Sequence, residues 1–133
     1  MPVLKNSLSQ SIIPRVPLEE LLKKFTCSSR YEILKYPKYL FLYLKRFQTN
    51  RFFKEKNKTI AEIPLENLCL SSHSYTLLGI LVHDGDAKSG SFKSFVRHGD
   101  LSFFEIEDIH VREVVPQTLT IIESYILLYA RNN

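Results

Sequence analysis

The segment YTLLGILVHDGDAKSGSFKSFV, residues 75–96, decides how this chain folds. Its first half is dense in aliphatic and β-branched side chains, which favour a strand, and Phe92, Phe95 and Val96 resume that pattern. Residues 83–90 between them are rich in Gly, Asp and Ser, which tolerate the backbone angles of turns. The segment therefore predicts a β-hairpin with a loop over residues 83–90 and with Ser91 at the far edge of that loop.

Short apolar runs separated by turn residues recur along the rest of the chain. The run YLFLYL at residues 39–44 is apolar at every position, which predicts a central strand covered on both faces. Further strands are predicted at residues 52–55, 59–63, 101–106 and 122–129. The predicted fold class is α+β, mostly antiparallel β-sheet with one short N-terminal amphipathic helix.

That helix is predicted from Leu18, Leu21, Leu22 and Phe25, which recur at the spacing of one helix face, with Pro17 at the first helical position. Residues 1–13 show no clean period and are expected to form a tail. The chain of 133 residues is thus predicted to be a single domain in which residues 14–131 form the folded part.

Composition excludes several classes of protein. A chain with 44% apolar and 12% aromatic residues is globular, and no run approaches the roughly 20 apolar residues of a membrane span. The first thirty residues or so lack the apolar segment of a signal peptide, so an intracellular protein without membrane contact is expected. Cys27 and Cys69 are expected to be reduced thiols, and neither a cofactor nor a metal site is predicted, because His73 and His110 are isolated.

Positive charge gathers in one stretch. Residues 45–58 carry a net charge of +5, which leaves −1 for the rest of the chain. Phe47, Phe52 and Phe53 lie among these basic residues, a combination that suits single-stranded RNA. The alternatives are a solvated hairpin face with its phenylalanines turned inward, which is favoured, and a surface that docks a protein.

Several landmarks follow one another in an order that is specific. They are YPKYL at 36–40, LKRF at 44–47, KN at 56–57, YTL at 75–77, HDG at 83–85, IED at 106–108 and SY at 124–125. Together they resemble the C-terminal half, called the palm, of the ubiquitin-specific protease catalytic domain. The strings IPRVPL at 13–18, FFKEKNKTI at 52–60, GSF at 90–92 and VPQ at 115–117 are similar to the catalytically inactive branch of that family, which is associated with the spliceosomal tri-snRNP.

The resemblance implies what the catalytic positions should hold. Active members use a cysteine from an Asn/Gly/Asn/Cys box, which belongs to the other half of the domain, and neither Cys27 nor Cys69 has its context. The family's histidine aligns with Ser91, and the acid that orients it aligns with Glu107. A serine hydroxyl is no base at neutral pH, and a positioned base contributes a factor of about 10² to 10⁴. His83 and His98 are interpreted as loop and strand-end histidines, so a pseudoenzyme is expected.

The implied function is assembly of the tri-snRNP in the nucleus through protein binding, with ubiquitin as a second, weak ligand. The candidate binding residues, chosen around the basic stretch and the hairpin loop, are Phe52, Phe53, Lys54, Lys56, Asp84 and Gly85. Direct RNA contact through residues 45–58 is less favoured. Two alternatives stay open, a thiol-dependent deubiquitinase or a fragment of one, and a basic RNA-contacting module.

Overall fold

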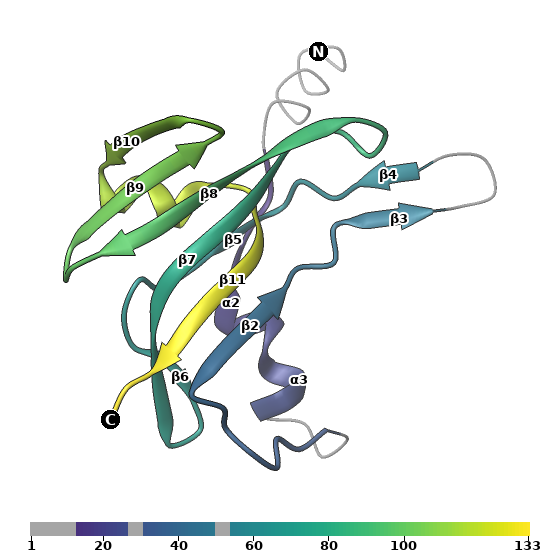
Figure 1. Cartoon of the computed structure of the whole chain (residues 1–133). Helices are drawn as coiled ribbons and strands as arrows, with labels where there is room; N and C mark the ends of the chain where they lie inside the picture. The colour runs from purple at the N-terminus through teal and green to yellow at the C-terminus, as the bar shows by residue number, and fades with distance from the viewer. Residues whose placement is uncertain (1–12, 27–30, 50–53) are drawn as a thin grey trace, which may run out of the picture.

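One antiparallel sheet dominates the protein, as Figure 1 shows. A computed structural model describes residues 13–26, 31–49 and 54–133. The sheet is ordered β10-β9-β8-β7-β11-β2, and β6 pairs with the start of β7. Its strands are β2 (Tyr39–Tyr43), β6 (Leu68–Leu70), β7 (His73–Gly85), β8 (Gly90–His98), β9 (Ser102–Glu107), β10 (His110–Val114) and β11 (Ser124–Arg131). The predicted fold class is confirmed.

Smaller elements lie around this sheet. Strand β1 (Arg15–Pro17) runs parallel to β5 (Ile60–Glu62), and β3 (Phe47–Thr49) forms an antiparallel ribbon with β4 (Lys54–Lys56). The helical elements are the turns α2 (Leu18–Leu21) and α3 (Lys23–Thr26) and the 3-10 helix η1 (Pro116–Ile121). Within the described part of the chain, no helix is both long enough and apolar enough to cross a membrane.

The predicted β-hairpin is present, but its strands reach further than expected. β7 continues to Gly85 and β8 begins at Gly90, so that Asp84 pairs with Ser91 inside the ladder. Ser91 is therefore a strand residue rather than the edge of a loop. The turn is short because Gly85 has φ of +132° and a side chain there would meet the carbonyl oxygen of Ser89 at 2.5 Å. The Asp86 carboxylate closes the turn by accepting the N–H groups of Lys88 and Ser89, and these bonds lower its pKa.

The prediction of a central strand at residues 39–44 is wrong. β2 pairs with β11 on one side and is an edge strand of the sheet in the described part of the chain. Leu40 and Leu42 turn toward the core, whereas Tyr39, Phe41 and Tyr43 alternate with them and are 52%, 68% and 58% exposed. An unbroken apolar run indicates two apolar faces, but it does not say whether this chain covers both of them.

The predicted amphipathic helix is divided in two. α2 ends before Leu22, and α3 begins after it. Pro17 is the residue that caps α2 rather than its first helical residue. Leu18 and Leu22 are buried, but Leu21 and Phe25 are exposed, so only half of the apolar stripe reaches the core.

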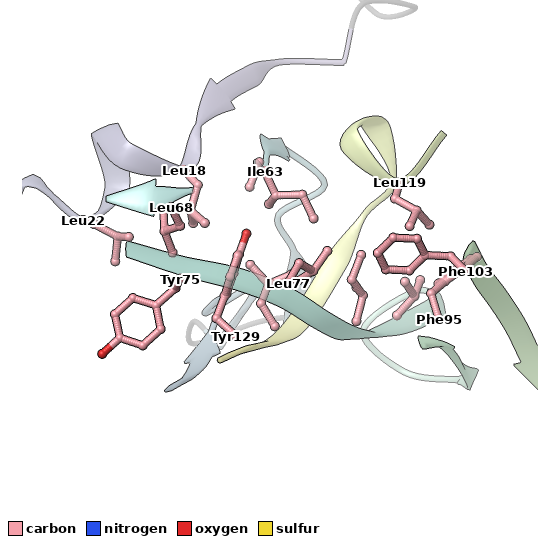
Figure 2. Close-up of a cluster of buried hydrophobic side chains, with 14 of the residues drawn as sticks. Leu18, Leu22, Ile63, Leu68, Tyr75, Leu77, Phe95, Phe103, Leu119 and Tyr129 are labelled. Atoms are coloured by element: carbon pink, nitrogen blue, oxygen red, sulfur yellow. The ribbon is translucent and has the colours of Figure 1, made fainter. Parts of the chain in front are cut away.

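The hydrophobic core lies on one face of the sheet. Figure 2 shows Leu18, Ile63 and Leu119 reaching toward the sheet from the segments that cover it. Tyr75, Leu77, Phe95, Phe103, Leu127 and Tyr129 supply the sheet's side of this cluster. The hydroxyls of the two buried tyrosines donate to backbone carbonyls, Tyr75 to Pro37 at 2.7 Å and Tyr129 to Pro64 at 2.8 Å, so both hydroxyls have a partner.

The 3-10 helix η1 gives a direct test of this core. Leu119 is fully buried, whereas Ile121, two residues later, is 47% exposed. We expect Leu119→Ala to lower the free energy of unfolding by about 2–5 kcal/mol, and Ile121→Ala to lower it by less than about 1 kcal/mol, because only the first leaves a cavity. Urea denaturation followed by circular dichroism measures both. Equal losses would show that η1 does not cover the sheet as described.

Candidate functional site

Ser91 and Glu107, the two positions predicted to align with catalytic residues, lie on the same face of the sheet. β8 and β9 pair with Ser94 opposite Ile106, and Ser91 and Glu107 are each an odd number of residues from that pair. Because side chains alternate along a strand, both point to the face opposite Ser94 and Ile106. That is the face of the buried residues Phe95 and Glu105. The strand register thus places the two aligned positions near one another, and both are exposed.

Beside them is an open hollow of about 730 Å³ lined by charged side chains. Glu105 is nearly buried at its base. The Nε of Arg112 donates a hydrogen bond to Oε2 of Glu105, and Nζ of Lys93 lies 3.2 Å from Oε1. The Arg112 bond, followed by the Lys93 interaction, holds the pKa of Glu105 below its usual range despite the opposing effect of burial. Both oxygens of this carboxylate are therefore occupied by cations.

The other residues of the hollow do not form a catalytic arrangement. Asp84, Glu107 and His110 also line it, and His110 pairs directly with Glu107 across the β9–β10 turn. No hydrogen bond joins these two described side chains. Sequence reasoning treated His110 as isolated, because it did not recognise the tight turn at Asp108, where φ is +53°. Across the described residues, no group of three or more His, Cys, Asp or Glu is placed to hold a metal ion.

The candidate binding residues divide between two surfaces. Lys54 lines a groove of about 430 Å³ between the β3–β4 ribbon and the β7–β8 hairpin, together with Phe47, His83 and Phe92. Asp84 lines the charged hollow instead, and Gly85 forms the turn. Phe52 and Phe53 lie outside the described residues, as does Cys27. The role of Phe52 and Phe53 in binding stays a prediction.

Lys56 holds the hairpin in place. Its side chain is only 3% exposed, and its Nζ donates to the carbonyl oxygens of His83 at 2.8 Å and Gly85 at 3.0 Å. The same nitrogen lies 2.9 Å from Oε1 of Glu123, which directly precedes β11. Sequence reasoning counted Lys56 among the surface charges, because a basic residue between polar neighbours gives no sign of burial.

Arg46 has a similar role and is also buried. Its Nε donates to the carbonyl oxygen of Ser124 at 2.5 Å, and its Nη1 donates to those of Asn57 at 2.9 Å and Thr59 at 2.6 Å. Burial lowers the pKa of Arg46, and the nearby Glu123 opposes that shift. Two residues of the predicted basic surface are thus structural cations. Arg46 and Lys56 therefore belong neither to a solvated face nor to a surface open to RNA.

His83 is part of an aromatic cluster rather than a base. Its ring packs edge-on against Phe47 and Phe92, each with a centroid distance of 5.1 Å. The rings of Phe47 and Phe92 in turn contact Tyr125. The cluster joins the β3–β4 ribbon, the hairpin and β11. His83 lies on the face opposite Ser91, because its strand neighbour Asp84 is the partner of Ser91.

Cys69 is exposed and lies far from these positions. It pairs with Ser74 at the opposite end of β7, and Ser74 and Asp84 are separated by roughly 33 Å at the rise of an extended strand. A nucleophile and its base must lie within hydrogen-bond reach of each other. Cys69 therefore cannot act together with the positions of Ser91 and Glu107 in one molecule.

Comparison with known proteins gives a consistent result. The sequence profile of the ubiquitin carboxyl-terminal hydrolase family matches residues 4–129. Human ubiquitin carboxyl-terminal hydrolase 39 is 33% identical over 99% of this chain and 28% of its own length. The probable mRNA-splicing protein ubp10 of Schizosaccharomyces pombe is 24% identical over 99% of this chain and 32% of its own length. The chain spans about a third or less of the length of these relatives.

Solved structures share the fold. A crystal structure titled as an essential yeast splicing factor matches 91% of this chain and 31% of its own chain, with a TM-score of 0.78 and 23% identity. A yeast SAGA Ubp8 module bound to monoubiquitin matches 90% of this chain and 35% of its own chain, with a TM-score of 0.73 and 22% identity. At these identities the likeness supports the fold alone.

Mutation can test whether Lys56 stabilises the fold as a buried cation or is a surface charge. We expect Lys56→Met to lower the free energy of unfolding by about 3 kcal/mol, because it leaves Glu123 without its cation and two carbonyls without their donor. Lys54→Met, on the same strand but exposed, should cost less than about 0.5 kcal/mol. Chemical denaturation of both variants decides the matter, and a Lys56→Met protein as stable as the parent would refute the assignment.

Proposed function

This chain belongs to the ubiquitin carboxyl-terminal hydrolase family, and we propose that it is a non-catalytic member that acts in pre-mRNA splicing. Its role would be that of a tri-snRNP assembly factor in the nucleus, working through protein binding. The proposal rests on the predicted alignment of Ser91 with the family's histidine, which would leave that position without a base. The relative named as a probable mRNA-splicing protein supports the link to splicing.

The side chains around Ser91 support the proposal that no other residue replaces the missing base. A thiol is only slightly ionised near neutral pH unless an imidazole or another cation stands beside it. The cations of the hollow, Lys93 and Arg112, are both engaged by Glu105, and a protonated side chain of either kind accepts no proton. His83 points to the other face of the sheet. His110 lines the hollow on the same face as Glu107, but among the described side chains no hydrogen bond joins the two into an acid–base pair.

The proposed contact surface is the tip of the hairpin with the β3–β4 ribbon beside it. Lys54 and the turn residues Asp86 and Lys88 line the groove between them, and Asp84 lies on the hairpin's other face. The Lys56 bonds hold this tip against the ribbon, so its shape is set before a partner arrives. Phe52 and Phe53 are proposed to extend the surface.

Deubiquitination remains the competing function, because solved structures of the same fold are titled as bound to ubiquitin. It would require a thiolate from Cys27 or from outside these 133 residues, since Cys69 lies too far away. The proposal therefore keeps ubiquitin only as a weak ligand and assigns no hydrolysis to the chain.

Binding to the tri-snRNP is the direct test. The tagged chain should retain tri-snRNP proteins from nuclear extract, as identified by mass spectrometry. The double variant Lys54→Glu/Asp84→Lys should reduce their recovery several-fold, because it reverses two exposed charges of the proposed surface. Glu113→Lys, which reverses an exposed charge on β10, is the matched control. Failure of the unaltered chain to retain any tri-snRNP protein would contradict the proposal.

Restoring the missing base should not restore hydrolysis. We expect Ser91→His to release no fluorophore from a ubiquitin C-terminal amide substrate, because Cys69, the one cysteine among the described residues, lies too far away to supply a thiolate. The unaltered chain should also remain unlabelled by a thiol-reactive ubiquitin probe, while a small alkylating reagent labels the exposed Cys69. Cleavage by the variant, or labelling by the ubiquitin probe, would favour the deubiquitinase instead.

A further inference from the structure

The edge strand β2 has a sequence that reads the same in both directions, Tyr39-Leu40-Phe41-Leu42-Tyr43. A strand of this kind is self-complementary. When two copies run antiparallel with Phe41 at the centre, each tyrosine faces a tyrosine, each leucine faces a leucine, and the phenylalanines face each other. Two-fold symmetric contacts require this property, because one patch must fit itself.

The backbone of β2 is oriented for such pairing. The N–H of Leu44 donates to Tyr125, and the carbonyl of Lys38 accepts from Arg131, so the even-numbered peptide groups face β11. The N–H and C=O groups of Tyr39, Phe41 and Tyr43 therefore point away from β11. No strand of the described part of the chain pairs with that edge. These three residues also carry the exposed rings.

We propose that two copies of this chain associate through their β2 strands, antiparallel and centred on Phe41, to form one continuous sheet. Phe41 then makes a hydrogen-bonded pair with Phe41 of the second copy, and Tyr39 makes one with Tyr43 of the second copy. Both kinds of pair use the outward-facing peptide groups. A register shifted by one residue would place even-numbered groups at the seam, where they are already used by β11.

A groove receives the other face of the incoming strand. It has a volume of about 500 Å³ and lies between β2 and the turns α2 and α3, which Figure 1 shows beside β2. Leu21, Leu22 and Phe25 line it from the helical side, and Leu42 and Leu44 from the strand. In the proposed register, Leu40 and Leu42 of the second copy enter this groove, which accounts for the exposed apolar side chains of α2 and α3.

The size and charge of the seam predict a weak dimer. Aromatic side chains bury about 150–250 Å² when fully enclosed, so the half-exposed rings and the groove amount to roughly 1,000 Å² in all, at the low end for specific contacts. Lys38 and Lys45 flank β2, and in this register each falls beside the other lysine of the second copy, so that like charges repel at both ends of the seam. Salt screens this repulsion, so association should strengthen as ionic strength rises. Pro37, which has no N–H, limits the length of the pairing.

Sedimentation equilibrium from low micromolar to millimolar concentration tests the association. The chain should shift from monomer to dimer, and more so in high salt. Phe41→Lys should raise the dissociation constant roughly tenfold or more, because it removes the central aromatic pair and adds like charges. Val111→Lys is the matched control, since Val111 is as exposed on β10 at the opposite edge. Phe41→Pro removes the outward N–H as well as the aromatic ring, so it should also prevent dimers.

Cross-linking tests the register. With Cys27 and Cys69 replaced by Ser, Phe41→Cys should form a disulfide-linked dimer on oxidation, because only position 41 faces itself. Tyr39→Cys should not, since it faces Tyr43 of the second copy. Circular dichroism confirms that each variant is folded. A monomer at all concentrations, a dimer that survives Phe41→Lys and Phe41→Pro, or equal cross-linking at positions 39 and 41 would each overturn the proposal.

Discussion

Two buried cations hold this small sheet protein together. Arg46 bonds to carbonyls of β11 and of the link between β4 and β5, and Lys56 bonds to carbonyls of β7. A cation removed from water must find acceptors, and backbone carbonyls supply them here without a full set of counter-charges. Since these segments lie far apart in the sequence, the bonds fix how the ribbon and the hairpin sit against the sheet. Arg46 belongs to the landmark LKRF, and Lys56 to the landmark KN.

Much of the fold could be predicted from the sequence, and the limits have physical causes. The hairpin was predictable because its strands are long and its turn is rich in Gly and Asp. β1 and β6 were missed because three residues are too few to show a period. β10 was missed because it is exposed along nearly its whole length, so that no burial pattern marks it. The turn before it depends on one residue, Asp108, at positive φ.

For the candidate site, the order of landmarks pointed to Ser91 and Glu107, whose catalytic alignment stays a prediction. The strand register puts both residues on one face of the sheet. The Lys93–Glu105–Arg112 cluster could not be foreseen, because its members come from three strands whose pairing only the fold determines. The burial of Lys56 and Arg46 could not be predicted for the same reason. The sequence shows that a charged side chain needs a partner. Whether that side chain can be buried depends on which carbonyl groups the fold places beside it.

The wrong prediction that β2 is a central strand and the inference of self-association have the same cause. A strand with leucines on one face and aromatics on the other indicates that both faces meet protein. In the described part of this chain only the leucine face does so. A solvated edge strand commonly carries charged residues or a proline, and here these stand at the ends, at Pro37, Lys38 and Lys45, but not within the strand. A second surface is therefore needed to account for the aromatic face. The palindromic order of its side chains, with outward peptide groups at the odd positions, identifies the same strand of another copy as the surface that fits.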